Sequence, residues 1–360
     1  MKRTGCFVLA VMMCAMLFMP AVATDEKPYV NTVGDANPLL VIEEAFKTTS
    51  PIDAGTPTTT KDSYKIGISL RWAWHPFVAS ISKGVQDCAK KWEEALGVPV
   101  EVIVTSCTGD SGEQQVADLE YLHVQGVDGA VMFANDPIIF IPTLTELYAA
   151  SNIPMALADG SMDSTEYLTW VSPDYKVGGA IGADIMAEIL PKGSKVIIYN
   201  HGPGAGISTD RVNAFYDRAI ELGLDPYPVA IITDQTPEVG MSTLSDSLTA
   251  YPDIAGVFMG TNTAVPGFLA AMEEFGREDI KIVCYDLDED TLNYVAEGKV
   301  YGSVVNDPYG EGWEGLNQVM YYLTGQYDRV YKRVLPATRK LTVNNWQEFE
   351  DDPQVIYSRK

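Results

Sequence analysis

The chain has 360 residues, of which 46% are hydrophobic, and its 49 Asp and Glu against 25 Lys and Arg give a formal net charge of −24. This apolar content excludes a wholly disordered chain, and the length favours two domains over one small domain. The acidic balance excludes nucleic acid and anionic lipid as main partners, because both are bound through clustered Lys and Arg.

Residues 1–23 have the layout of a secretory signal peptide. Lys2 and Arg3 form a basic start, the stretch Cys6–Met19 is apolar, and Ala21-Val22-Ala23 is a small-residue cleavage site. The apolar stretch is shorter than the about 20 residues that a membrane-spanning helix needs. We therefore expect cleavage after Ala23 and a mature protein in the periplasm or outside the cell.

Residues 24–62 differ from the rest of the chain. They contain Ser50-Pro51 and the run Gly55-Thr56-Pro57-Thr58-Thr59-Thr60-Lys61, a composition typical of a linker. We interpret this segment as an N-terminal leader or linker with one short apolar stretch, 39–42.

From Tyr64 onward, apolar strands alternate with amphipathic helices. The strand 65–70 is followed by a helix whose apolar residues begin at Val78, and the alternation continues to a long helix at 313–323. Strands that lack polar alternation and are each followed by a helix indicate parallel sheets covered on both faces. About ten such units exceed one open sheet, which leaves two lobes or a single eight-fold barrel.

The two halves of this region resemble each other. Gly129-Ala130-Val131-Met132-Phe133-Ala134-Asn135 matches Gly256-Val257-Phe258-Met259-Gly260-Thr261-Asn262 in the position of its Gly and Asn residues. Each segment leads through a helix to a strand that ends in Asp, at Asp159 and Asp286, with the same Gly-to-Asp offset in both halves. This repetition favours two similar α/β lobes over a barrel.

Two segments resemble ligand-binding motifs but lack a residue that each motif requires. Gly202-Pro203-Gly204-Ala205-Gly206 lacks the last glycine of a dinucleotide fingerprint, since Ile207 stands there, and is interpreted as a turn. The acidic run from Asp286 to Glu297 has Thr291 where a calcium loop needs Gly, so a helix N-terminus is the simpler interpretation and calcium the minor alternative.

Catalytic and metal-binding motifs are also lacking in the sequence. The three histidines are far apart, and no metalloprotease or nucleophile-elbow motif occurs, so we predict neither an enzyme nor a cofactor or metal. After cleavage, Cys88, Cys107 and Cys284 remain. Cys88 and Cys284 are expected in the core, and a Cys88–Cys107 disulfide stays an open alternative.

The loop after the first strand combines a cation with aromatic rings. Arg71, Trp72, Trp74, His75 and Phe77 follow the carboxyl end of a parallel strand, where α/β sheets bind ligands. Sugar C–H faces stack on aromatic rings, and Arg and Asp side chains form hydrogen bonds with sugar hydroxyls. Burial in the core is the alternative for Trp72 and Phe77.

Asp159 and Asp286 close strands at the same edge. A carboxylate there is able to accept hydrogen bonds from two sugar hydroxyls, and a helix N-cap is the alternative role.

At these residues the chain resembles the periplasmic sugar-binding proteins of ABC importers, in the type I group with ribose-, galactose- and arabinose-binding members. The resemblance extends from Tyr64 to about Asn345. It is carried by the order and spacing of Pro76-Phe77, Asn152-Ile153-Pro154 before Asp159, Ser172-Pro173-Asp174, Gly178-Gly179, Arg211 before Phe215, Thr261-Asn262, Tyr285-Asp286 and Asn306-Asp307-Pro308.

The resemblance implies an α/β fold of two doubly wound parallel-sheet lobes with three hinge crossings near Ser172, Asn306 and Pro336. Lobe 1 would comprise residues 63–172 and 307–336, and lobe 2 residues 173–306 and 337–360. By this resemblance His75, Phe77 and Asp159 contact ligand from lobe 1, Arg211, Asp286 and Asn306 from lobe 2, and Arg71, Gln235 and Thr261 occupy further contact positions.

The chain departs from the ribose-type pattern in two places. Gly160 stands where an Arg is usual, and Gln235 where an aromatic residue is common. These departures count against ribose as the ligand. Trp72 and Trp74 would compensate for the missing contacts at positions 160 and 235.

The function implied is a monomeric exported protein that binds a monosaccharide or polyol and delivers it to an ABC permease. A sensory receptor for a membrane kinase or chemoreceptor and a secreted carbohydrate-active enzyme are the alternatives. A sugar-responsive repressor would need a basic helix-turn-helix before the core, where this chain has a signal peptide and a Thr/Pro-rich segment.

Overall fold

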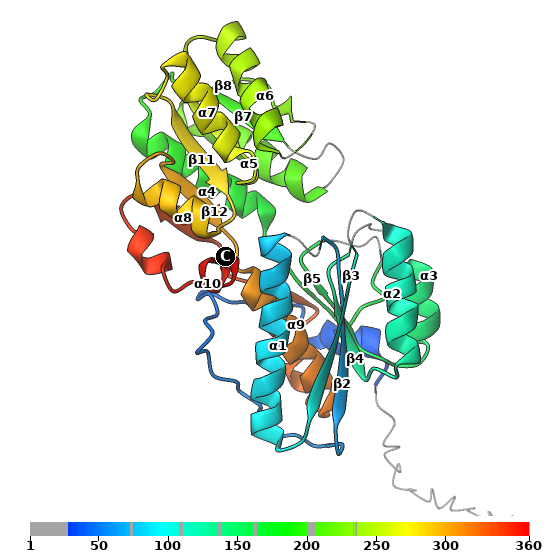
Figure 1. Cartoon of the computed structure of the whole chain (residues 1–360). Coiled ribbons are helices and arrows are strands. Elements are labelled where there is room, and N and C mark those ends of the chain that lie inside the picture. Colours follow the sequence, from blue (N-terminus) through cyan, green and yellow to red (C-terminus); the bar gives the residue numbers. More distant parts are fainter. Residues whose placement is uncertain are drawn as a thin grey trace, which may run out of the picture.

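The computed structural model describes residues 28–72, 75–107, 111–134, 138–160, 164–200, 206–232, 234 and 236–359. The predicted signal peptide, most of the glycine-rich turn at 202–206, Trp74 and Gln235 lie outside these ranges. The described residues form two lobes, each built on one β-sheet (Figure 1).

Lobe 1 contains a sheet whose described strands are all parallel. Its central strands are buried along their whole length, which explains why their sequences lack polar alternation. In order across the sheet the strands are β1 (Leu39–Val41), β13 (Arg333–Leu335), β6 (Thr169–Val171), β5 (Met155–Ala158), β4 (Gly129–Met132), β2 (Tyr64–Leu70) and β3 (Val100–Ser106).

Helices cover both faces of this sheet. One face packs against α1 (Pro76–Leu96) and α9 (Pro308–Leu323), and the other against α2 (Gly112–Val124) and the π-helical turn η2 (Leu144–Ala149). The short helix α3 (Ile141–Thr143) precedes η2. Neighbouring strand residues point to opposite faces, so Val131 belongs to the first core and Met132 to the second.

Lobe 2 repeats this plan with one antiparallel strand. In order, its strands are β14 (Arg339–Thr342), β12 (Gly302–Val305), β11 (Lys281–Tyr285), β10 (Ile254–Met259), β7 (Lys195–Asn200) and β8 (Asp225–Pro226), and β9 (Ala230–Ile231) also pairs with β7. Only β14, among the described strands, runs antiparallel to its neighbour. One face packs against α4 (Tyr175–Ile189) and α5 (Gly206–Leu222), the other against α6 (Pro237–Ala250), α7 (Val265–Phe275) and α8 (Glu289–Ala296).

The described chain passes between the sheets three times. It leaves lobe 1 after β6, returns after β12, and leaves again between β13 and β14. These crossings fall at residues 172–174, 306–307 and 336–338. The two-lobed α/β class and its three-crossing hinge, predicted from the sequence, are therefore confirmed.

The N-terminal leader is more ordered than its linker-like composition predicts. Its described part, 28–62, contains the 3₁₀ helix η1 (Val30–Ala36) and strand β1, and it packs on lobe 1. The Thr58 N–H donates to the Thr324 carbonyl at 2.9 Å, and the Tyr321 hydroxyl donates to the Asp53 carbonyl at 2.9 Å. These long-range partners fix a segment whose Pro and Thr content favours an extended, unpaired backbone.

The C-terminal helix α10 (Pro353–Ser358) lies between the two lobes (Figure 1). The Tyr357 hydroxyl donates to Asp87 Oδ2 on α1 at 2.8 Å, and Ser358 Oγ accepts the Glu289 N–H of α8 at 2.9 Å. The last helix of residues 337–360, the segment assigned to lobe 2 by the resemblance, therefore contacts both lobes. The remaining short turns are η3 (Tyr327–Arg329) and η4 (Trp346–Phe349).

Cys88 and Cys284 are buried free thiols in the core, as predicted, and Cys107 is buried as well. Because Cys88 is a free thiol, the Cys88–Cys107 disulfide does not form. Within the described part of the chain, no helix combines the length and apolar character that crossing a membrane requires.

Candidate functional site

Asp159 and Asp286 follow the carboxyl ends of β5 and β11. Both are buried, with 5% and 7% of their surface exposed, and both have a left-handed backbone, with φ of 58° and 74°. Asp is one of the few non-glycine residues that tolerate this conformation. Neither is a helix N-cap; Asp288 caps α8 instead, accepting the Thr291 N–H at 2.7 Å. The acidic run therefore begins a helix, as its simpler interpretation predicts.

His75 is the N-cap of α1, and Pro76 is the first residue of that helix. Its Nδ1 accepts the Phe77 N–H at 3.2 Å. Burial, together with the positive charges of Arg71 and Arg211, lowers the pKa of His75 to about 4. The imidazole is therefore neutral near pH 7, and because Nδ1 accepts, the ring proton is on Nε2, which is a hydrogen-bond donor.

Arg71 lies on aromatic rings beside His75. Its Cζ is 3.4 Å from the centroid of the Trp72 ring and 5.3 Å from that of Phe133. Trp72, half-buried with φ of 48°, packs against the lobe 1 core, and Phe77 is a buried member of it. Phe77 therefore lies in the core and Trp72 packs against it, as their core alternative states. Both rings also lie beside the His75 ring, with centroids 6.5 and 6.0 Å away.

Arg211 comes from α5 in lobe 2 and is 4% exposed. Its Cζ lies 3.9 Å from the centroid of the Tyr285 ring, its Nη1 donates to the Gly260 carbonyl at 3.0 Å, and its Nη1 lies 3.7 Å from Asp286 Oδ2. Burial opposes the charge of Arg211, but Asp286, Tyr285 and Asp159 outweigh it and raise the pKa. The guanidinium is thus charged and held in place by packing.

Asn306 and Thr261 are also buried in this part of lobe 2. Asn306 Oδ1 accepts the Tyr285 hydroxyl at 3.2 Å, and its carbonyl accepts Gln354 Nε2 at 2.9 Å. Thr261 Oγ1 lies 3.5 Å from Thr263 Oγ1. Asn306 stands at the second hinge crossing, so its side chain sits where the lobes meet.

Charges of the two lobes act on one another. Burial raises the pKa of Asp159 to about 6; Arg211 and Arg71 act to lower it, and Asp286 to raise it. Burial also raises the pKa of Asp286, against the effect of Arg211. The charge of Arg211 in lobe 2 shifts the pKa values of Asp159 and His75 in lobe 1. These groups therefore lie in one region between the lobes. We call Arg71, His75, Asp159, Arg211 and Asp286 the interlobe site.

The interlobe site contains polar atoms that are buried without a hydrogen-bond partner among the described residues. They are Asp159 Oδ1, Asp286 Oδ1, Arg211 Nε and, at its edge, Asn306 Nδ2. Buried polar atoms are normally paired, and leaving them unpaired costs free energy. Two acceptors and two donors arranged in this way match a ligand with several hydroxyl groups.

The structure brings most of the sequence-predicted residues into or beside this site, and it also adds others. Tyr285 and Tyr175 hold Arg211 between aromatic rings, with Cζ-to-centroid distances of 3.9 and 5.1 Å. Tyr285 directly precedes Asp286, the one sequence signal that could have found it. Trp74 and Gln235 lie outside the described residues.

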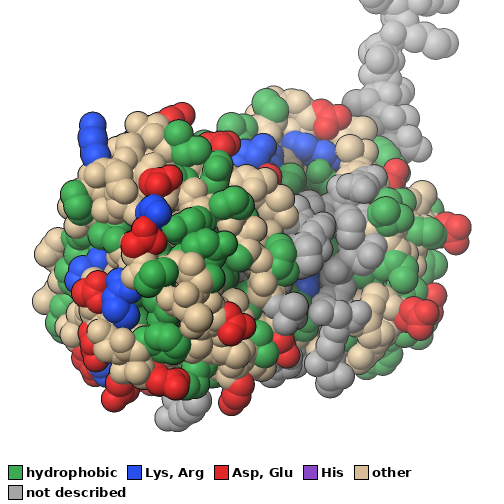
Figure 2. All heavy atoms as spheres, turned by 90° about the horizontal axis from the view of Figure 1, so that it is seen from above, with side chains coloured by type: hydrophobic (Ala, Val, Ile, Leu, Met, Phe, Trp, Pro, Cys, Tyr) green, Lys and Arg blue, Asp and Glu red, His purple; other side chains and the backbone are tan. Residues whose placement is uncertain are grey.

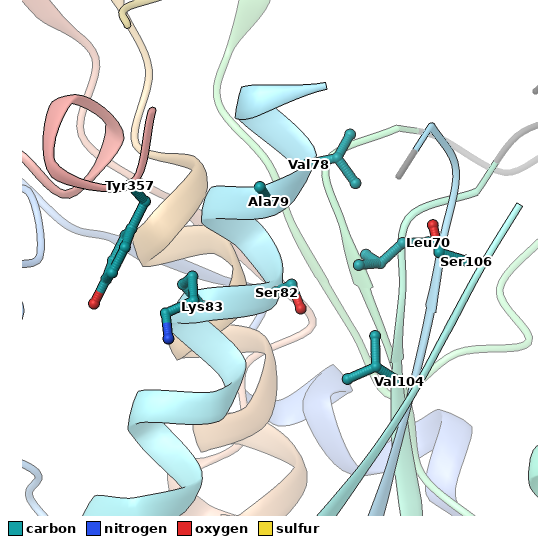
Figure 3. A pocket seen from close by; sticks show the side chains of 8 residues that line it. All are labelled: Leu70, Val78, Ala79, Ser82, Lys83, Val104, Ser106 and Tyr357. Atoms are coloured by element: carbon teal, nitrogen blue, oxygen red, sulfur yellow. The ribbon is translucent and has the colours of Figure 1, made fainter. Parts of the chain in front are cut away.

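A separate hollow of about 320 Å³ lies beside α1 on lobe 1 (Figure 3). It is lined by Leu70, Val78, Ala79, Ser82, Lys83, Val104, Ser106 and Tyr357. None of these residues belongs to the interlobe site, and the lining offers no carboxylate. On the face drawn in Figure 2, Asp and Glu side chains are scattered among Lys, Arg and hydrophobic side chains without gathering into one patch.

Two α/β lobes joined by a three-crossing hinge, with buried polar groups converging between them, define a two-lobed solute-binding protein. The chain belongs to the family defined by the periplasmic binding protein domain, whose model matches residues 66–327.

Curated relatives agree with this family. The ribose import binding protein RbsB of Bacillus subtilis (strain 168) is 28% identical over 252 residues, which cover 69% of this chain and 78% of that protein. The protein of the same name from Escherichia coli (strain K12) is 23% identical over 256 residues, covering 70% and 82%.

Solved structures show the same fold. The substrate-binding protein of a sugar ABC transport system from Bordetella parapertussis 12822 has a TM-score of 0.73 at 17% identity, covering 85% of this chain and 97% of that one. An ABC transporter periplasmic solute-binding protein from Actinobacillus succinogenes 130z, solved with bound D-allose, has a TM-score of 0.71 at 20% identity, covering 79% and 99%.

Proposed function

We propose that this protein is an exported solute-binding protein that captures a monosaccharide or related polyol between its lobes and releases it unaltered to an ABC permease. The observation that carries the proposal is the set of unpaired buried atoms on Asp159, Asp286 and Arg211. The relatives named for ribose import and the neighbour with bound D-allose support a sugar as the ligand.

The physical basis is a ligand-dependent hinge equilibrium. A sugar that bridges the lobes gains hydrogen bonds to Asp159 and Asp286 together only when both lobes approach it, so binding favours the closed arrangement. Neutral His75 donates from Nε2, and charged Arg211 donates from a rigid position, so neither group needs to reorganise. The aromatic rings of Trp72 and Phe133 provide apolar surface for sugar C–H groups.

The sugar differs from ribose in this proposal. Gly160, with φ of 52°, follows Asp159, and an added Cβ there would meet the Ala134 carbonyl at 3.5 Å and the Phe133 ring at 3.6 Å. The position thus has room beside the ring but provides no guanidinium of its own. A ligand with a different arrangement of hydroxyls suits this site better.

Isothermal titration calorimetry with a panel of pentoses, hexoses and polyols tests the proposal. We expect at least one sugar to bind the parent protein and to lose affinity for the Asp159→Asn and Asp286→Asn variants. Chromatography of the sugar recovered from the complex should return it unchanged. A parent that binds no member of the panel, or that converts one, contradicts the proposal.

The monomeric state and the permease partner belong to the same proposal. Sedimentation of the mature chain tests the first, and sugar uptake by vesicles that carry the permease, with and without the binding protein, tests the second.

A further inference from the structure

Glu311 is a fully buried acid to which the proposed function assigns no role. It lies in the first turn of α9, immediately after the second hinge crossing, and its exposed surface is 0%. Neither Oε1 nor Oε2 has a hydrogen-bond partner among the described residues. Such burial of an unpaired carboxyl is unfavourable unless something else satisfies it.

The same helix shows what a paired buried glutamate looks like. Glu314, one turn further along α9 and 4% exposed, accepts Gln318 Nε2 on Oε1 at 2.6 Å and Asn317 Nδ2 on Oε2 at 3.1 Å. Within the described part of the chain, Glu314 therefore has hydrogen-bond partners and Glu311 has none.

The surroundings of Glu311 belong to the interlobe site. The charges that act on it are those of Asp159, which follows β5, Asp307 at the second crossing, Arg211 of α5 and Arg333 of β13. Burial, reinforced by Asp159 and Asp307, raises the pKa of Glu311 well above its ordinary value, against the opposing effect of Arg211 and Arg333. A neutral carboxyl both donates and accepts a hydrogen bond, as a sugar hydroxyl does.

We propose that Glu311 forms the floor of the interlobe site and hydrogen-bonds a hydroxyl of the bound sugar, directly or through one water. This inference rests on the proposed function. It explains why the unpaired atoms of Asp159, Arg211, Asn306 and Glu311 occur in one region: each is completed by the same ligand. It also makes Glu311 a determinant of which sugar is accepted, since a ligand lacking that hydroxyl would leave the acid unsatisfied.

Two variants separate this role from a structural one. Glu311→Met keeps the approximate volume but removes both oxygens, and Glu311→Gln keeps a group that donates and accepts. For the sugar that binds the parent best, we expect Glu311→Met to lose at least about tenfold in affinity, the loss of one buried hydrogen bond. Its melting temperature without ligand should equal or exceed that of the parent, because an unpaired buried polar group is gone.

Glu311→Gln should stay within about threefold of the parent in affinity, because one neutral hydrogen-bonding group replaces another. Glu314→Gln is the matched control: it makes the same carboxyl-to-amide change at the paired glutamate of the same helix and should leave sugar affinity unchanged. An affinity of Glu311→Met within about threefold of the parent overturns the inference. If the parent binds no sugar, it is the proposed function that fails.

Infrared difference spectroscopy keeps the inference testable if Glu311→Met does not fold. At pH 8, where Asp159 and Asp307 with pKa values of about 6 are ionised, sugar binding should shift a protonated carboxyl band in the parent. This shift should be absent in Glu311→Gln. A parent in which no carboxyl band, protonated or ionised, shifts on sugar binding, or the same shift in Glu311→Gln, refutes a contact between Glu311 and the ligand.

Discussion

Asp159 and Asp286 occupy equivalent positions in the two lobes and are held by equivalent hydrogen bonds. The Asp159 N–H donates to the Val171 carbonyl and the Asp286 N–H to the Val304 carbonyl, each at 2.8 Å. The Asp159 carbonyl accepts Trp170 Nε1 at 3.1 Å, and the Asp286 carbonyl accepts Ser303 Oγ at 2.6 Å. Both lobes thus maintain a left-handed aspartate, a conformation that costs about 1 kcal/mol or more and that tends to occur at functional sites.

Asn is the substitution that isolates the carboxylates, because it tolerates a left-handed backbone. Asp159→Asn and Asp286→Asn should keep the fold and each lose about 1.5–3 kcal/mol of sugar-binding free energy, the contribution of a charge-assisted hydrogen bond. Calorimetry measures the loss. Asp184→Asn, which alters a half-buried acid on α4 that pairs with Arg218, is the control. Equal affinities for all three variants would mean that the aspartates do not contact ligand.

The same substitution at Asp159 should change how stability depends on pH. The folded-state pKa of about 6 lies above the ordinary 3.8, so the folded protein binds this proton more tightly than the unfolded chain. The stability due to Asp159 is full below about pH 4 and is lost as the pH rises through about 6, a change of about 3 kcal/mol. Asp159→Asn lacks this loss, so its stability relative to the parent should increase from pH 4 to pH 8.

Urea unfolding at several pH values measures this difference between variant and parent. His75, whose pKa of about 4 lies below the ordinary 6.5, acts in the opposite sense: its contribution is lost as the pH falls from 6.5 to 4. It is present in both proteins and cancels from the difference. A difference that stays constant across this range would contradict the elevated pKa of Asp159.

Features of the fold and site that depend on neighbouring residues could be predicted from the sequence, and features that depend on partners distant in sequence could not. Strand and helix periodicity, and the equal offset from Gly to Asp in each half, are local signals, so the two lobes and the aspartates could be predicted. The packing of residues 28–62 on lobe 1 depends on partners such as Thr324 and Tyr321, far away in sequence, which composition does not reveal. Glu311 could not be predicted, because an acid in the first turn of a helix is ordinarily explained by the helix dipole.

Arg211 should contribute strongly to binding, since it is charged, buried and fixed by the Tyr285 ring and the Gly260 carbonyl. We expect Arg211→Ala to cost about 2–4 kcal/mol of sugar-binding free energy. Arg218→Ala, on the same helix but on the surface with Asp184 and Glu221, should bind like the parent. Calorimetry decides, and an Arg211→Ala affinity within about threefold of the parent would remove Arg211 from the site.

The contacts of α10 predict that the C-terminus restrains the hinge. Truncation after Asp352 removes the Tyr357–Asp87 hydrogen bond to lobe 1 and the Ser358–Glu289 hydrogen bond to lobe 2, so the ligand-free lobes should separate more widely. Small-angle X-ray scattering should then show a larger radius of gyration without ligand. Tyr357→Phe, which loses only the hydroxyl, should lower the free energy of unfolding by about 1 kcal/mol. Tyr121→Phe, at an exposed tyrosine, is the control and should change neither the scattering nor the free energy of unfolding. Identical scattering by the truncated and parent proteins would show that α10 does not restrain the hinge.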